Sequence, residues 1–244
     1  MPGFPTLLRN AIVILSLLPA LAAAEPRATD HNRHGWYNYF GDHGLGGTRW
    51  GVHLEGQYRR HDFIASWQQL LIRPGVNYEV NPALLLTFGY AYARSYPYSN
   101  RAPASGVSNE HRIWEQAQWR YRTGRAALNT RVRFEQRFLG SANPAQSGFR
   151  YENRLRTWEQ ITLPISRRTY FSAYDEVWLY VKPYVSKSAF DQNRAYAAVG
   201  LRLNPAWRME VGYMNQALLH RSGSVLELNH TLVLSVFSIA RFKL

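Results

Sequence analysis

The chain has 244 residues and a formal net charge of +13, and it contains no cysteine. The lack of cysteine excludes a disulfide framework and thiolate chemistry. No run of about 18 apolar residues occurs after Glu25, so the sequence predicts no transmembrane helix. The length favours one domain, which we place at residues 25–244. The only lysines are Lys182, Lys187 and Lys243, so arginine supplies almost all of the positive charge.

Residues 1–24 have the layout of a secretory signal peptide. Arg9 lies in a short basic region, an apolar run extends from Ala11 to Leu18, and Ala22 to Ala24 supply small residues for cleavage. The apolar run is too short for a spanning helix, so we expect cleavage, with a retained anchor as the alternative. Export predicts a location in the bacterial outer membrane. Nucleic acid is scarce there, so we expect no nucleic-acid partner despite the arginine bias.

The alternating side chains of strands begin early in the chain. After a polar segment at 25–35, which we expect to be irregular and mobile, a short aromatic strand is predicted at 36–40. Residues 49–60 then alternate strictly, and the stretch 66–94 contains two strands joined at Asn81-Pro82, because proline has no amide to donate to a ladder. In the second of these strands one face is apolar and carries Leu84, Leu86, Phe88, Tyr90 and Tyr92.

Further strands are predicted at 110–122, 127–138, 150–163, 169–181, 191–203, 208–218 and 227–244. Long loops at 97–109, 139–149 and 182–190 alternate with short turns, which is typical of outer-membrane barrels. Ten long strands and one short one conflict with the even number expected of a closed antiparallel barrel. Either the 36–40 strand lies outside the wall or one strand is unrecognised.

These patterns predict an all-β fold, an antiparallel transmembrane β-barrel of about ten to twelve strands with short periplasmic turns and longer extracellular loops. A soluble barrel would carry its apolar face inside, whereas a membrane barrel reverses the two faces. The polar face here mixes arginine, glutamate and aromatic residues densely, which favours a lumen filled by paired charges. The predicted ion-pair network of the lumen consists of Arg112, Arg131, Arg133, Glu135, Glu152, Arg154, Arg156, Glu176 and Arg194.

Two consequences follow from this assignment of faces. If Trp114 points inward, its neighbour Glu115 faces lipid, and Glu159 does the same on an equivalent strand, where a charge is costly at mid-depth. The inward residues of the 84–94 strand are small, so we expect any open passage to run along the 66–94 stretch.

Several segments also resemble a known family. The likeness covers nearly all of the mature chain and rests on Leu71 to Tyr78, Tyr174 to Trp178, Asp191 to Tyr196 and Asn229 to Leu232. These segments resemble the bacterial domain-of-unknown-function family DUF2490, whose members are predicted outer-membrane β-barrels. The resemblance implies the fold and the location, and it supplies no activity.

The sequence favours a narrow or plugged pore, or a structural barrel, whose arginine-rich lumen favours small anionic solutes. The alternative is a lipid- or lipopolysaccharide-modifying enzyme at the loop rim, with His61, Asp62 and Ser66 as weak catalytic candidates. His31 and His34 lack further ligands at metal-binding spacing, so we expect neither a metal nor another cofactor. Expected partners are outer-membrane lipid, lipopolysaccharide and the barrel-assembly machinery.

Overall fold

The computed structural model describes residues 28–99, 106–141, 148–181 and 188–243. The predicted signal peptide at 1–24 lies outside the described residues, as do parts of the three long loops. The described part of the chain contains no helix long and apolar enough to cross a membrane.

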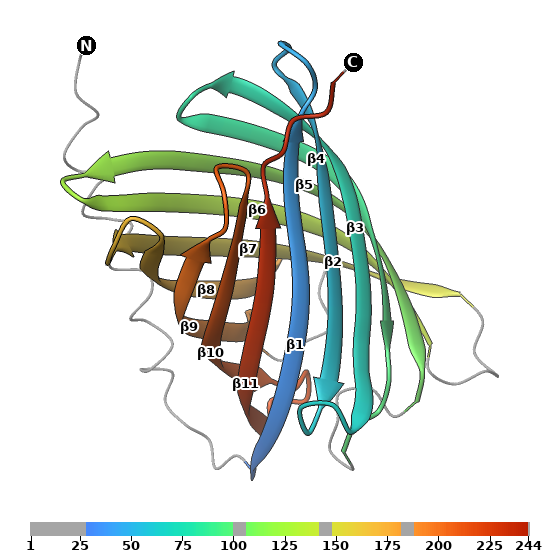
Figure 1. Ribbon diagram of the computed structural model, residues 1–244. Helices are drawn as coiled ribbons and strands as arrows, with labels where there is room; N and C mark the ends of the chain where they lie inside the picture. Colours follow the sequence, from blue (N-terminus) through green and yellow to red (C-terminus); the bar gives the residue numbers. More distant parts are fainter. Residues whose placement is uncertain (1–27, 100–105, 142–147, 182–187, 244) are drawn as a thin grey trace.

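Eleven strands form one closed barrel, in which each strand pairs with its neighbours in chain order (Figure 1). The barrel confirms the predicted fold class, and the number of strands lies within the predicted range. The strands are β1 (Ala28–Gly44), β2 (Trp50–His61), β3 (Ser66–Asn81), β4 (Leu84–Ser95), β5 (Ser108–Thr123), β6 (Ala126–Gly140), β7 (Phe149–Pro164), β8 (Thr169–Val181), β9 (Phe190–Arg202), β10 (Trp207–Leu219) and β11 (Val225–Ser238).

The barrel closes through a parallel pair, β1 with β11, which lie side by side in Figure 1. Trp36 lies opposite Val233 of β11 and Arg59 of β2, so β1 is hydrogen-bonded on both edges. The expectation that residues 25–35 are irregular and that 36–40 is a short strand was therefore wrong from Ala28 onward. Both alternatives for the strand count were also wrong, because an odd number closes when one pair is parallel.

The odd number of strands places the start of β1 and the end of β11 at opposite ends of the barrel. The three long loops share the first end with the short connections 62–65 and 220–224, and the other short turns share the second end. β11 ends at Ser238, earlier than the predicted Leu244, because the chain then crosses the end of β1. There Phe242 forms an isolated bridge with Leu45, and the Ala240 carbonyl bonds His43.

The two faces of the wall have opposite character. Large apolar side chains point outward and are exposed, as Phe88 at 58% and Val211 at 52% illustrate. Charged side chains point inward and are buried, as Arg133 and Glu135 illustrate. This distribution is the reverse of that in a soluble barrel, and it is the one that surrounding lipid requires.

The small inward residues of β4 leave no passage. Ala91 and Ala93 have no exposed surface, and the ring of Trp114 from β5 fills the space above Gly89. A Cβ added at Gly89 would lie 2.6 Å from that ring and 2.5 Å from the Pro74 carbonyl oxygen. The expectation of an open path along residues 66–94 was therefore wrong, because small residues here make room for a neighbouring tryptophan.

Gly89→Val should destabilise the barrel by at least about 2 kcal/mol, because the new side chain overlaps Trp114 and the β3 backbone. The matched control is Gly56→Val on β2, where an added Cβ meets nothing within 4 Å. Denaturant unfolding in detergent micelles measures both variants. Equal stability of the two would contradict the packing described here.

Candidate solute-binding lumen

Glu135 of β6 is the centre of a network of ion pairs inside the barrel. Its Oε2 atom accepts hydrogen bonds from Nε and Nη2 of Arg154 at 2.9 and 2.6 Å, and Oε1 accepts one from Nη1 of Arg156 at 2.8 Å. Arg73 and Arg112 approach Oε1 at 3.5 and 3.8 Å. One fully buried carboxylate thus faces four guanidinium groups, which reach it from β3, β5 and β7.

Two further carboxylates extend this network across the lumen. Glu176 of β8 binds Arg156 at 2.7 Å and Arg131 at 2.6 Å. Glu55 of β2 binds Arg73 at 2.7 Å. Arg73 and Arg156 therefore each connect two carboxylates, so the ion pairs form a continuous chain from β2 to β8. Paired and hydrogen-bonded charges of this kind satisfy one another in a low-dielectric interior.

Several guanidinium groups make cation–π contacts with tryptophan rings. The Cζ atoms of Arg154, Arg156 and Arg194 lie 4.1, 3.9 and 4.0 Å from the ring centroid of Trp178. These distances are within the range of cation–π attraction, and the flat ring fixes the three arginine side chains in place. Three of the crowded positive charges thus contact a single indole ring.

The network and its tryptophans fill the middle of the lumen. Trp114 and Glu135 have no exposed surface, and Arg133 and Trp178 are almost fully buried. The described side chains therefore close the barrel at this level.

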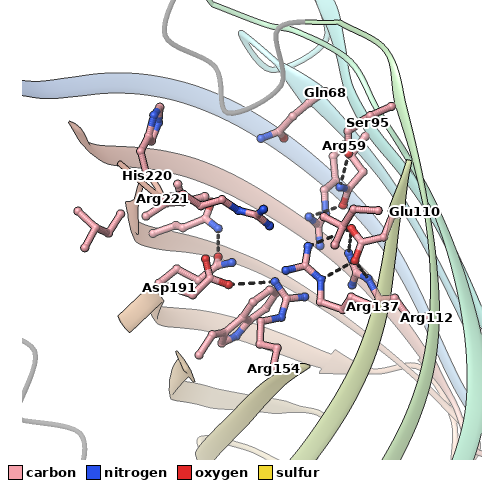
Figure 2. A pocket seen from close by; sticks show the side chains of 18 of the residues that line it. Arg59, Gln68, Ser95, Glu110, Arg112, Arg137, Arg154, Asp191, His220 and Arg221 are labelled. Carbon is pink, nitrogen blue, oxygen red and sulfur yellow. Dashed lines mark hydrogen bonds and ion pairs between the residues drawn. The ribbon is translucent and has the colours of Figure 1, made fainter. Parts of the chain in front are cut away.

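A cavity of about 560 Å³ lies above this closed level, at the end of the barrel that carries the long loops (Figure 2). We call it the cup. Its wall includes neutral amides, hydroxyls and the edge of Trp36. The acidic residues in the described lining are Glu110 and Asp191, whereas the arginines are Arg59, Arg112, Arg137, Arg150, Arg154, Arg194 and Arg221.

The two carboxylates of the cup are already engaged by arginine. Glu110 lies between Arg112 and Arg137, with contacts of 2.7 and 2.5 Å, as Figure 2 shows. Asp191 binds Nη1 of Arg154 at 3.0 Å. Glu152, which lies outside the lining, binds Arg137, Arg150 and Arg221. Arginine still outnumbers carboxylate in the described lining of the cup.

A hydrogen-bonded cluster joins the rim of the cup. The buried carboxylate of Glu227 on β11 accepts hydrogen bonds from the Tyr98 hydroxyl at 2.7 Å and from Nδ2 of Asn229 at 3.2 Å, and His220 lies 2.6 Å away. Burial and the neighbouring Glu227 carboxylate raise the pKa of the Tyr98 hydroxyl well above its ordinary value. Tyr98 therefore stays protonated and donates, which ties the segment after β4 to β11.

All nine residues predicted for the lumen network point inward, and each contacts a charged or aromatic side chain, which for Arg133 and Glu152 lies outside the nine. Glu152 lies toward the rim, where Arg137, Arg150 and Arg221 surround it. The sequence analysis did not assign Glu55, Arg59, Arg73, Glu110, Arg137 and Asp191 to the site. The period-two alternation that identified the nine predicted residues also identifies most of these six as inward-facing, because the side chains of β2 and β3 alternate in the same way.

His61, Asp62 and Ser66 do not form a catalytic arrangement. Nε2 of His61 lies 3.4 Å from Asp62, while Nδ1 is buried without a hydrogen-bond partner. Ser66 lies opposite His61 in the ladder but does not hydrogen-bond this nitrogen. Among the residues that the structure describes, no group of three or more histidine, aspartate or glutamate side chains could hold a metal ion.

Glu115 and Glu159 face outward, as the inward position of Trp114 requires. Each carboxylate has a hydrogen-bond donor on the outer face. Glu115 accepts a hydrogen bond from Gln136 at 3.4 Å, and Glu159 accepts one from Thr130 at 2.6 Å. These neighbours reduce the cost of a carboxylate on an otherwise apolar face.

Comparison with known proteins finds a matching family and proteins of similar sequence or structure. The family model described as "Protein of unknown function (DUF2490)" matches residues 33–227. An uncharacterized protein of Methylorubrum extorquens is 27% identical over 191 residues, which cover 75% of this chain and 78% of the relative. A solved structure of the NanC porin is 12% identical and has a TM-score of 0.46, covering 78% of this chain and 90% of the porin chain.

Glu135→Gln should destabilise the barrel by about 3–5 kcal/mol, because the neutral amide removes the carboxylate that four buried guanidinium groups share and leaves each of them with a single other carboxylate. The matched control is Glu115→Gln on the neighbouring strand, which removes an outward charge and should leave stability unchanged or higher. Both are measured by denaturant unfolding in micelles. If Glu115→Gln lost more stability than Glu135→Gln, the assignment of the inward and outward faces would be contradicted.

Proposed function

This chain belongs to the DUF2490 family, and we propose that it is an outer-membrane barrel whose arginine-rich lumen binds small anionic solutes and passes them slowly. Solutes enter the cup from the end that carries the long loops. The ion-pair network below the cup is the constriction.

The observation that carries this proposal is the uneven charge of the cup. Its described lining contains far more arginine than carboxylate, and both carboxylates are already paired. A cleft lined by one sign of charge within low-dielectric walls focuses the field and concentrates counter-ions. Rings of arginine in pores favour anions for the same reason.

Passage through the constriction requires the network to exchange partners. Arg154 lines the cup and also binds Glu135, so its guanidinium belongs to both regions. Arg156 lies next, between Glu135 and Glu176. An anion that replaces a carboxylate on one arginine meets the next arginine at hydrogen-bonding distance. Binding at several weak sites in sequence is the arrangement that allows an ion to enter and leave.

Lipid or lipopolysaccharide modification at the loop rim has no comparable support, because His61, Asp62 and Ser66 do not assemble a base and nucleophile. On the present proposal, outer-membrane lipid and lipopolysaccharide contact the apolar outer wall, and the barrel-assembly machinery inserts the exported chain.

Planar bilayers that separate unequal KCl concentrations test the proposal. The protein should conduct weakly, with a reversal potential that favours chloride. Arg154→Ala should lower the chloride-to-potassium permeability ratio by about twofold or more, because it removes a charge from the cup. Arg154→Lys keeps the charge and should retain most of the preference. Silence at every voltage, or a preference for potassium in the unmodified protein, would contradict a passage for anions.

A further inference from the structure

Arg59 is a buried arginine without a carboxylate partner. It lies on β2, lines the cup and is 8% exposed. Its Nη1 donates to Gln69 at 2.7 Å, and its Nε and Nη2 donate to Gln57. Both partners are neutral amides, and among the described residues no carboxylate lies within 4.0 Å of the Arg59 guanidinium. The charge of Arg59 is therefore hydrogen-bonded but not compensated.

Arg194 of β9 is also incompletely compensated. Its nearest carboxylate is Glu176, 3.7 Å from Nη1. Glu176 already holds Arg131 and Arg156 at 2.6 and 2.7 Å. Nε of Arg194 is buried and has no hydrogen-bond partner. Arg194 therefore has both spare charge and a spare donor within the lining of the cup.

The two arginines contact the same indole. The Cζ atoms of Arg59 and Arg194 lie 3.8 and 4.9 Å from the ring centroid of Trp36. The Trp36 Nε1–H donates to Oε1 of Gln68 at 2.8 Å, which fixes the ring. Cation–π contact orients the guanidinium groups but supplies no counter-charge. Two under-compensated cations thus contact one fixed indole in the lining of the same cavity.

Electrostatics makes this arrangement unfavourable while the cavity contains only water. The charges of Arg194, Arg112 and Arg73 repel that of Arg59, and Glu55 offsets part of this repulsion from beyond contact distance. A buried guanidinium that lacks a counter-ion is unfavourable, whereas the forked donors of a guanidinium group match the oxygens of a carboxylate or phosphate. An anion at this position would supply the missing charge and use the free donor of Arg194.

The rest of the cup suits an uncharged polar body attached to that anion. Gln68, Gln216 and Asn229 line the same cavity, and Oδ1 of Asn229 has no hydrogen-bond partner. Amide side chains donate and accept, so they can bind hydroxyl, carbonyl or amide groups. A cavity of about 560 Å³ is of the size that holds small organic ligands.

We propose that Arg59 and Arg194, positioned by Trp36, form a discrete binding site for the carboxylate or phosphate monoester group of a compact polar organic anion. The proposal rests on the proposed function, because it names the class of solute that the cup takes. It adds that the solute is held at one saturable site before any passage.

Isothermal titration calorimetry on the folded protein in detergent micelles tests the site with three probes: propionate, methyl phosphate and the uncharged propionamide. We expect saturable binding of one or both anions and none of propionamide, and the two anions distinguish a carboxylate site from a phosphate site. Arg59→Gln and Arg194→Gln should each weaken binding at least about tenfold. The matched control, Arg168→Gln in the exposed turn between β7 and β8, carries the same charge change outside the cup and should bind normally.

The stability of ligand-free Arg59→Gln provides a second readout. Because this variant removes an uncompensated buried charge, it should be at least as stable as the unmodified protein toward denaturant. Lower stability would overturn the proposal, since it would mean that Arg59 is compensated without ligand. Equal binding by Arg59→Gln, or no saturable binding of either anion, would also overturn it. Saturable binding without anion conductance would contradict only the proposed passage of anions. Anion conductance without saturable binding would contradict only the binding site at Arg59 and Arg194.

Discussion

The contact between the Glu135 carboxylate and its four guanidinium neighbours is the constraint on which the interior of this barrel depends. Charges removed from water must be compensated by other charges and by hydrogen bonds, and here the compensation comes from strands that do not pair with one another. Arg73 on β3 reaches Glu135 on β6 across the lumen. The network therefore fixes the distance between opposite walls and fills the space that a wider barrel would leave to water.

The balance of charge changes along the barrel, and this change links the structure to the proposed role. In the middle, arginine and glutamate alternate closely, and tryptophan rings fill the remaining space. Toward the long loops, arginine exceeds carboxylate and a cavity opens. The middle region favours closure, because its carboxylates are shared among several arginines and tryptophan rings fill the remaining space. An unbalanced region favours an incoming anion, because an anion relieves the repulsion between neighbouring arginines.

Period-two alternation predicted most strands and the inward face of the network, because a wall with lipid on one side and paired charges on the other allows little freedom of register. The role of β1 was not predictable in this way. The first residues of β1 are polar on both faces of the strand, so they show no alternation. One of the two strands that pair with β1 is β11, a parallel partner about 200 residues later in the chain. The filled lumen was also missed: Gly89 and Ala91 indicated space, whereas Trp114 on the next strand occupies it. Arg59 appears on the polar face in the sequence, but only the structure reveals that its neighbours are amides.

The central claim is that a closed, charge-filled lumen lies beneath an open cup, and site-directed labelling of this cysteine-free chain tests it most directly. Ser95→Cys and Thr87→Cys place single thiols on the inward face of the same strand, the first in the lining of the cup and the second at a buried position beside Asn77. A membrane-impermeant maleimide should label the thiol at position 95 readily and should label the thiol at position 87 only after unfolding. Similar rates at the two positions would contradict the account, because they would mean that a continuous water-filled path runs through the barrel.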